Sequence, residues 1–203
     1  QNKSKLYRIC LDFRELNTVL EFPQQTSFVT IDEILLKLGG KKVVSLDISS
    51  AFFIIPIKES DRHKTAFWVN QHSFEFNAAV MGLQSSPYHL VKFLARAFDQ
   101  KTFDIIKQSL TAEEQLLTPQ SFEQMLIAYF DDLFLYRDTY EELYVALKML
   151  LMAARIAKIK FSAEKTKFFT TRVKVLGYSF DTSDVTLTMC KIKANGIMNI
   201  KKP

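Results

Sequence analysis

Two adjacent carboxylates interrupt an otherwise apolar stretch of this sequence. Asp131 and Asp132 split the run 125–136 (MLIAYFDDLFLY), and two apolar strands that meet at such a pair predict a β-hairpin with a doubly negative tip. An Asp-Asp turn on a surface hairpin is the ordinary interpretation of the pair. A third carboxylate, Asp47, lies in another strand-like segment, 42–57 (KVVSLDISSAFFIIPI), and favours an interpretation in which the three act together.

Carboxylates that lie close together in an apolar setting indicate a bound cation. Burying several of them costs several kcal/mol per ion unless positive charge lies among them. Oxygen ligands with few His or Cys residues nearby favour Mg²⁺, which shares carboxylates with substrate phosphates. Two such ions held about 4 Å apart can activate a 3′-hydroxyl and stabilise a departing pyrophosphate.

Composition narrows the class of protein. The 203 residues are 48% apolar and 24% charged, which excludes a disordered or collagen-like chain. No apolar run approaches the roughly 18 residues of a membrane span, so we expect no membrane partner. The net charge of +5 favours a polyanionic partner.

Two cysteines, Cys10 and Cys190, are too few for a disulfide framework and indicate a reducing compartment. The missing initiator Met indicates a piece of a longer polypeptide.

Hydrophobic periodicity predicts helices and antiparallel hairpins that alternate along the whole chain. The expected helices cover 30–38, 86–98 and 140–157, and the expected strands and hairpins cover 6–13, the first half of 42–57, 65–79, 125–136 and 175–187. The second half of 42–57 fits a strand or a helix. The polar segment 99–123 fits a surface loop or a short helical insert. This order predicts an α+β fold in which helices back an antiparallel sheet.

A basic segment follows the last predicted helix. Between positions 155 and 174 a single acid, Glu164, opposes seven basic residues: Arg155, Lys158, Lys160, Lys165, Lys167, Arg172 and Lys174. Such a run is usually a solvated face. It can also neutralise the phosphates of a nucleic acid.

Six motifs in order resemble the reverse transcriptases of LTR retrotransposons, most of all the gypsy-type elements, and of retrovirus-like Pol polyproteins. They are RICLDFRELN (8–17), LDISSAFF (46–53), KTAF (64–67), MGLQSSP (81–87), YFDD (129–132) and LGY (176–178). The resemblance implies the palm of a right-hand polymerase with partial fingers. Its implied boundaries are fingers at 1–21 and 55–85, palm at 22–54 and 86–182 with an insert near 99–123, and the start of the thumb or connection at 183–203. We expect the rest of the thumb and the ribonuclease H domain to be absent.

The resemblance also implies a catalytic set. Asp47 and Asp131 would be the principal metal ligands, Asp132 would complete the triad, and the carbonyl of Ile48 would add a ligand. The cofactors would be two Mg²⁺ ions, for which Mn²⁺ can substitute. Lys165 matches a lysine that protonates the departing pyrophosphate; the alternative for it is a solvated charge.

Four further positions match nucleotide contacts of the family. Arg8 would meet the triphosphate, or be a solvated surface Arg, and Phe52 would exclude a 2′-hydroxyl, or be a plain core Phe. Gly82 would allow a close approach beside the base pair. Met81 stands where retroviruses carry glutamine and lacks that polar contact. Counting back to the family's finger lysine reaches Gln1, although Lys3 or Lys5 could substitute.

Leu176, Gly177 and Tyr178 match the hairpin that grips the primer terminus, with an ordinary hairpin as the alternative. The implied function is RNA-directed DNA polymerase, acting on an RNA or DNA template with its primer and on dNTPs. The resemblance also implies a possible homo- or heterodimer with other Pol regions. It implies a location in a cytoplasmic particle or in the nucleus. The rival functions are a catalytically silent nucleic-acid-binding or scaffold copy of the fold and an RNA-dependent RNA polymerase.

Overall fold

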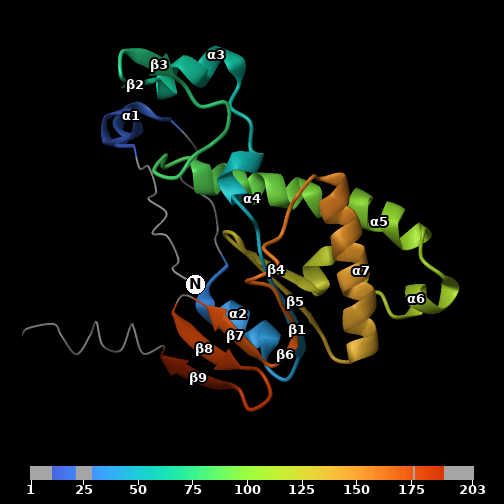
Figure 1. The fold of residues 1–203 in the computed structure, drawn as a ribbon. Helices are drawn as coiled ribbons and strands as arrows, with labels where there is room; N and C mark the ends of the chain where they lie inside the picture. Colours follow the sequence, from blue (N-terminus) through green and yellow to red (C-terminus); the bar gives the residue numbers. More distant parts are fainter. Residues whose placement is uncertain (1–10, 22–28, 176, 190–203) are drawn as a thin grey trace, which may run out of the picture. The chain divides into compact units, whose positions relative to one another are not determined.

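The computed structural model describes residues 11–21, 29–175 and 177–189 (Figure 1). The chain forms two compact units, which are described separately: residues 1–26 with 50–93, and residues 27–49 with 94–203. In the described part of the chain, no helix is both long and apolar enough to cross a membrane.

The larger unit is built on a four-stranded antiparallel sheet in the order β4-β5-β1-β6. Its strands are β1 (Lys42–Asp47), β4 (Leu126–Tyr129), β5 (Asp132–Arg137) and β6 (Lys167–Thr170). The central strands β1 and β5 pair from Lys42 opposite Arg137 to Asp47 opposite Asp132. The predicted hairpin at 125–136 and the strand in the first half of 42–57 are therefore confirmed.

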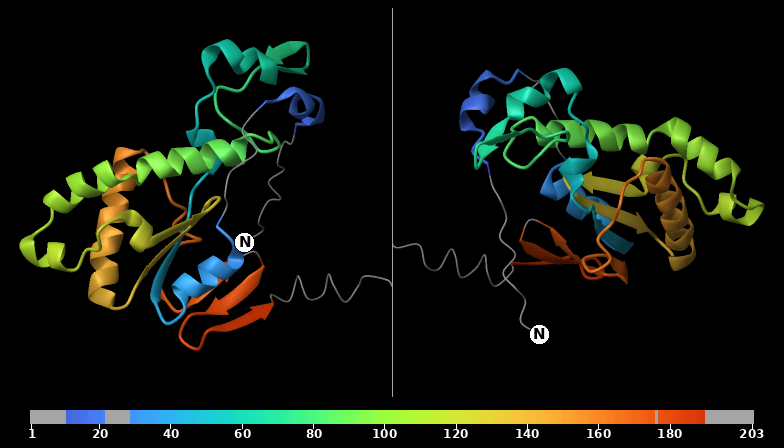
Figure 2. Two further views of the ribbon diagram at one scale, coloured as in Figure 1. Left: turned by 180° about the vertical axis from the view of Figure 1, so that it is seen from behind. Right: turned by 45° about the horizontal axis from the view of Figure 1, so that its top comes forward.

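The two faces of this sheet are covered by different elements (Figures 1 and 2). Helix α7 (Tyr140–Ile156) contacts β1 and β5 on one side, and α5 (Gln100–Gln108) packs against α7. On the other side, one buried cluster joins the sheet to α2 (Ile31–Leu38) and to a second sheet of β7 (Arg172–Val175), β8 (Tyr178–Asp181) and β9 (Thr186–Met189). The sheet thus lies between a helical layer and a mixed layer.

Capping sequences fix where these helices begin. Thr30 and Thr139 each accept a hydrogen bond from the backbone N–H three residues on, and Glu33 and Glu142 accept one from the backbone N–H of the threonine in return. This reciprocal arrangement satisfies two backbone donors at each helix start. The helices predicted at 30–38 and 140–157 are confirmed, as is the hairpin within 175–187, to which β7 adds a third strand.

The polar segment 99–123 is helical. It contains α5, α6 (Ala112–Leu116) and, at its end, the short 3₁₀ helix η3 (Phe122–Gln124). Phe122 anchors it, with its ring 5.2 Å from that of Phe103 and 5.5 Å from that of Phe98. Of the two structures that the sequence allowed for this segment, the helical insert is the one that forms, because these few apolar residues pack together.

The smaller unit contains short elements. They are α1 (Arg14–Val19), η1 (Ala51–Ile54), α3 (Glu59–Arg62), η2 (His63–Thr65), β2 (Phe67–Val69), β3 (His72–Phe74) and the start of α4 (Ser86–Ala97). The predicted hairpin at 65–79 is confirmed: β2 pairs with β3 around Asn70 and Gln71, which adopt φ values of 47° and 67°. Positive φ at both residues is typical of the tight turn that matches strand twist.

One strand prediction is wrong in its described part. Residues 11–13 are not in a strand, and a helix follows at once from Arg14. Phe13 is instead buried against Val80 and Leu83 in a small apolar cluster. Residues 6–10 of that prediction lie outside the described residues.

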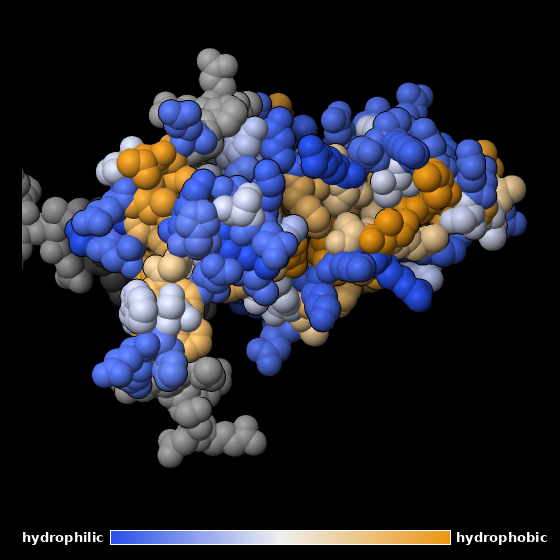
Figure 3. Space-filling view, turned by 90° about the horizontal axis from the view of Figure 1, so that it is seen from above, coloured by the Kyte–Doolittle hydropathy of each residue, from blue (hydrophilic) through white to orange (hydrophobic). Residues whose placement is uncertain are grey.

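The surface seen in Figure 3 alternates hydrophilic and hydrophobic areas, and the exposed apolar side chains include Trp68 and Leu116.

Candidate active site

A two-residue turn places the adjacent carboxylates at the tip of the β4–β5 hairpin. Tyr129 pairs with Asp132 across the hairpin, so Phe130 and Asp131 form the turn. Phe130 has a φ of 52°, in the left-handed region that a bulky residue rarely adopts, and its ring contacts that of Tyr129 at 4.8 Å. Such a conformation costs about 1 kcal/mol or more and persists only where the surroundings enforce it.

The strand register brings Asp47 to the same place. Asp47 is the last residue of β1 and lies directly opposite Asp132, and the N–H of Ile48 donates to the carbonyl of Asp131 over 2.8 Å. Side chains alternate between the faces of a sheet, so Asp132 lies on the face of Phe134, which is fully buried. This face of the sheet is therefore apolar at Phe134 and acidic where β1 ends and β5 begins.

A fourth charged residue meets the carboxylates from the segment before β6. The N–H of Ser162 donates to the carbonyl of Asp47. Residues 162–166 then form a turn, in which the hydroxyl and the N–H of Thr166 both donate to the carbonyl of Ser162. This turn carries Lys165, whose Nζ lies 3.0 Å from Oδ1 and 2.9 Å from Oδ2 of Asp47. The side chain of Asp47 is 15% exposed and that of Lys165 is 65% exposed.

Burial and neighbouring charges shift the pKa values of Asp132 and Lys165. Partial burial, followed by the negative charges of Asp131 and Asp47, raises the pKa of Asp132 to about 6. The hydrogen bond to Asp47 raises the pKa of Lys165 above its ordinary value. The three carboxylates are therefore close enough to repel one another, and the lysine lowers that repulsion.

The donor set fits a divalent cation in its chemistry, since it offers the oxygens of three carboxylates at one end of a sheet. Among the described residues, however, no three acidic, His or Cys side chains are arranged closely enough to hold an ion as they stand. The ammonium group of Lys165 takes the cationic place beside Asp47 instead. Sequence reasoning gave Lys165 a different role and did not predict this ion pair.

Three other predicted site residues belong to the smaller unit. Phe52, in η1 and half-buried, belongs to the smaller unit, as do Met81, which is 59% exposed, and Gly82. Gly82 adopts a φ of 98°, and a Cβ there would lie 3.2 Å from the ring of Phe13.

Asn17 fixes the loop that carries Gly82. Its side-chain amide donates to the carbonyl of Gly82 over 2.8 Å, and its side-chain oxygen accepts from the N–H of Gln84 over 2.9 Å. Asn17 ends the first motif, but sequence reasoning gave it no role. Its contacts span more than sixty residues, and no local pattern announces them.

Two of the three predicted primer-gripping residues, Gly177 and Tyr178, are described in the second sheet of the larger unit. Gly177, with a φ of 80°, is in the turn between β7 and β8, and Tyr178 pairs with Val175 and Met189. Arg8 and Leu176 lie outside the described residues.

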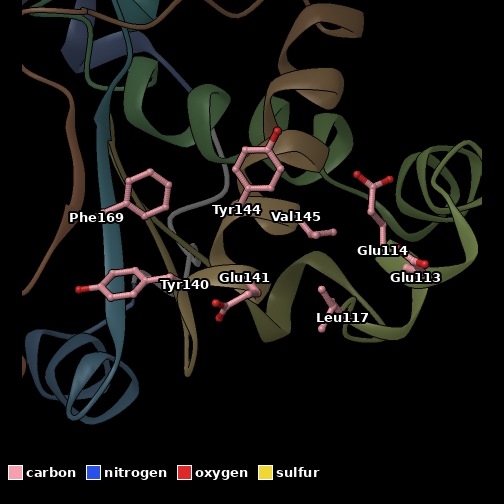
Figure 4. A pocket seen from close by; sticks show the side chains of 8 residues that line it. All are labelled: Glu113, Glu114, Leu117, Tyr140, Glu141, Tyr144, Val145 and Phe169. Atoms are coloured by element: carbon pink, nitrogen blue, oxygen red, sulfur yellow. The ribbon is translucent and has the colours of Figure 1, made fainter.

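A separate groove opens on the helical side of the larger unit (Figure 4). It measures about 560 Å³ and combines aromatic with acidic side chains, and its lining residues are Glu113, Glu114, Leu117, Tyr140, Glu141, Tyr144, Val145 and Phe169. One of these acids, Glu114, forms an ion pair with Lys148 at 2.7 Å. None of the three clustered aspartates lines this groove, so it does not belong to the acidic site.

Known proteins resemble the chain in sequence and in fold. It is 28% identical over 194 residues to the retrovirus-related Pol polyprotein from transposon opus of Drosophila melanogaster, covering 95% of the chain and 17% of that protein. It is 22% identical over 202 residues to the transposon Tf2-3 polyprotein of Schizosaccharomyces pombe, covering 99% of the chain and 13% of that protein. The chain thus spans less than a fifth of the length of either relative.

Solved structures share the fold at low identity. The foamy viral protease-reverse transcriptase in complex with an RNA/DNA hybrid matches with a TM-score of 0.69 and 18% identity, over 97% of this chain and 24% of that one. A second foamy viral structure, in complex with double-stranded DNA, matches with a TM-score of 0.71 and 20% identity, over 97% of this chain and 30% of that one. The family described as reverse transcriptase (RNA-dependent DNA polymerase) matches residues 1–180. Because this match covers most of the sequence, the chain belongs to the reverse transcriptase family.

Proposed function

We propose that this chain is the palm, with part of the fingers, of an RNA-directed DNA polymerase that adds deoxynucleotides to a primer 3′-end. The observation that supports this most is the position of Asp47 opposite Asp132, with Asp131 in the adjoining turn, where the sheet face becomes acidic. The domain boundaries implied by the resemblance belong to the same proposal: palm at 22–54 and 86–182, fingers at 1–21 and 55–85, and the start of the thumb at 183–203.

Reverse transcriptases use divalent metal ions, and the chain's own carboxylates supply the ligands. Asp47, Asp131 and Asp132, with the carbonyl of Ile48, would hold two Mg²⁺ ions. Bound there, the ions supply Lewis acidity that lowers the pKa of the primer hydroxyl and neutralises the charge that develops on the phosphates. The β4–β5 hairpin and β1 fix the backbone positions of the three carboxylates, so the rearrangement on metal binding would be confined to side chains.

Other residues would bind and orient the nucleotide. Phe52 would lie beneath the sugar and exclude a 2′-hydroxyl, while Arg8 would contact the triphosphate with its guanidinium group. Gly82 and Met81 would lie beside the base pair. Lys165 would donate a proton to the pyrophosphate as it leaves.

The template and primer would be an RNA or DNA duplex. The related foamy viral enzymes have been solved with an RNA/DNA hybrid and with double-stranded DNA, which supports this choice. Leu176, Gly177 and Tyr178 would grip the primer end, and the basic residues of 155–174 would meet phosphates. A dimer with other Pol regions would be compatible with this arrangement.

Primer extension tests the proposal. The full-length protein that carries this chain is incubated with poly(rA)/oligo(dT), Mg²⁺ or Mn²⁺, and either dTTP or UTP, and Asp131→Asn serves as the matched control. We expect extension with dTTP, little with UTP, and a loss of at least about a hundredfold in the control, because a ligand for the reacting groups is removed.

The other outcomes identify the rival functions. Binding of the primer-template without any extension would indicate the silent scaffold copy, which needs the fold but not the carboxylates. Equal use of UTP would contradict the role of Phe52 and favour an RNA-dependent RNA polymerase.

A further inference from the structure

The ion pair between Lys165 and Asp47 occupies the place where the acidic site would receive a cation. Both oxygens of Asp47 accept hydrogen bonds from Nζ of Lys165, at 3.0 Å and 2.9 Å. The carboxylate is mostly buried and the lysine mostly exposed, so the ammonium group closes the site on its solvent side. The negative charges of Asp131 and Asp132 also act on this lysine.

The backbone holds Lys165 in this position. Three hydrogen bonds converge on the carbonyl of Ser162, from the hydroxyl and N–H of Thr166 and from the N–H of Lys165, and they form one tight turn. The N–H of Ser162 in turn donates to the carbonyl of Asp47 at 2.9 Å. The lysine is therefore anchored to the strand that ends in its partner, and the contact follows from the fold rather than from a chance side-chain position.

We propose that Lys165 is a built-in competitor of the metal: its ammonium group neutralises Asp47 while the site is free of metal, and a divalent ion must displace it to bind. This inference rests on the proposed function, since it takes Asp47 to be a metal ligand. Nζ of Lys165 bonds both oxygens of Asp47, and its positive charge repels an incoming cation, so the lysine and the metal compete for this carboxylate. Arrival of the metal therefore breaks the two hydrogen bonds to Nζ.

Displacement has a consequence for the order of binding. The side chain of Lys165 is mostly exposed and its backbone is anchored beside Asp47, so the released ammonium group stays near the site and becomes free to meet a negatively charged group. A nucleotide triphosphate provides such groups. The lysine would thus be available to the substrate only after the metal has bound, which couples the two events.

Direct metal binding tests the competition without any measurement of catalysis. The electron paramagnetic resonance signal of free Mn²⁺ is titrated with the purified full chain and with Lys165→Gln, Lys165→Arg and Lys167→Gln. An exposed ion pair contributes little, so its loss is expected to tighten Mn²⁺ binding by about three- to tenfold in Lys165→Gln. Lys165→Arg keeps the charge and should bind no more tightly than the natural chain. Lys167→Gln removes an equal charge two residues away and should change affinity by less than about twofold.

Equal affinity of Lys165→Gln and the natural chain would overturn the proposal. Equal tightening in Lys167→Gln would also overturn it, because the effect would then be a general one of net charge. Asp47→Asn separates this failure from failure of the proposed function: if the natural chain binds no more Mn²⁺ than Asp47→Asn does, the metal site itself is wrong.

A second measurement observes Lys165 directly in the natural chain. The ¹⁵N and ¹H resonances of lysine ammonium groups are followed by NMR while Mg²⁺ is added, and Lys165→Gln serves only to assign the signal. We expect the Lys165 signal to shift and broaden at Mg²⁺ concentrations that saturate the site, because its ion pair is lost. A Lys165 signal that stays unchanged while Mg²⁺ binds would contradict displacement.

Discussion

Asp132 has the most perturbed carboxyl group of the acidic site, and its pKa of about 6 makes a prediction about stability. The ordinary value is 3.8, so the folded protein binds this proton more tightly than the unfolded chain does. Between pH 4 and pH 6 the unfolded chain has lost the proton while the folded protein still holds it. The free energy of unfolding therefore falls as the pH rises through this window, by roughly 2 kcal/mol after a reduction for the partial exposure of this carboxyl group.

Replacing Asp132 by Asn removes this penalty. With EDTA present, Asp132→Asn should be more stable than the natural chain by roughly 2 kcal/mol at pH 7.5, and the gain should vanish near pH 4. Urea unfolding at several pH values measures the difference. Asp131→Asn is the matched control: it relieves one of the repulsions on Asp132 and should therefore retain part of the pH dependence. A stability gain of Asp132→Asn that is the same at pH 4 and pH 7.5 would contradict the raised pKa of Asp132 as its cause.

The residues of the site were predictable to different degrees. Asp47, Asp131 and Asp132 stand out in the sequence because a carboxylate is costly inside an apolar strand. The contact of Lys165 with Asp47 joins residues 118 positions apart, and it depends on a tight turn with no strong local signal. The role of Asn17 was hidden for the same reason: long-range hydrogen bonds follow from the fold and leave no periodic pattern.

The loop of Gly82 is an element whose shape depends on one residue. Gly82→Ala should destabilise the protein by about 1–2 kcal/mol, because the side chain would be strained at a φ of 98° and would crowd the ring of Phe13 at 3.2 Å. Gly39→Ala is the matched control. Its Cβ would meet only ordinary contacts, at 3.5 Å or more, so its effect should stay within about 0.5 kcal/mol. Thermal unfolding measures both, and equal effects would contradict this account of the loop.

Helix α7 depends on its first turn as well as on its buried face. Thr139→Ala removes the side-chain oxygen that accepts from the N–H of Glu142, and it should cost about 1 kcal/mol of stability. Thr139→Ser retains the acceptor and should cost less than half as much. Denaturant unfolding of the two variants checks this, and a serine variant as unstable as the alanine variant would show that the methyl group matters more than the cap.

Helices and strands whose apolar residues recur at a clear helical or strand period were predicted well, and segments without such a period were predicted poorly. The capped helices and the tight hairpins carry their own signals in threonine, glutamate and turn residues. The insert 99–123 left two structures open because its sequence is polar, although Phe103 and Phe122 are enough to anchor it. The strand expected at 6–13 failed over 11–13 because burial of Phe13 against Val80 and Leu83 outweighed local β-propensity.

On the scale of the whole molecule, the antiparallel α+β fold was predictable from the order of its elements, whereas the placement of charge required the structure. The basic residues between 155 and 174 are all exposed, and two of them come close to β1 in addition to Lys165, which bonds Asp47. The carbonyl of Lys160 accepts from the N–H of Ser49, and Lys167 lies opposite Ser45 in the β1–β6 ladder. Exposed positive charge thus borders the strand that ends in Asp47, as expected where a nucleic acid backbone is to be held near the carboxylates.

This distribution of charge predicts how binding depends on salt. If Lys160 and Lys167 contact phosphates, the double variant Lys160→Gln/Lys167→Gln should bind an RNA/DNA hybrid more weakly at low salt, and the slope of log affinity against log salt concentration should become shallower by about 2, or about 0.9 for each lost contact. Lys37→Gln/Lys101→Gln removes the same net charge from exposed positions on α2 and α5 and should leave the slope nearly unchanged. Fluorescence anisotropy from 50 to 300 mM KCl measures both slopes. An equal decrease in the two double variants would mean that net charge alone attracts the nucleic acid, and it would remove the reason for placing the duplex beside β1.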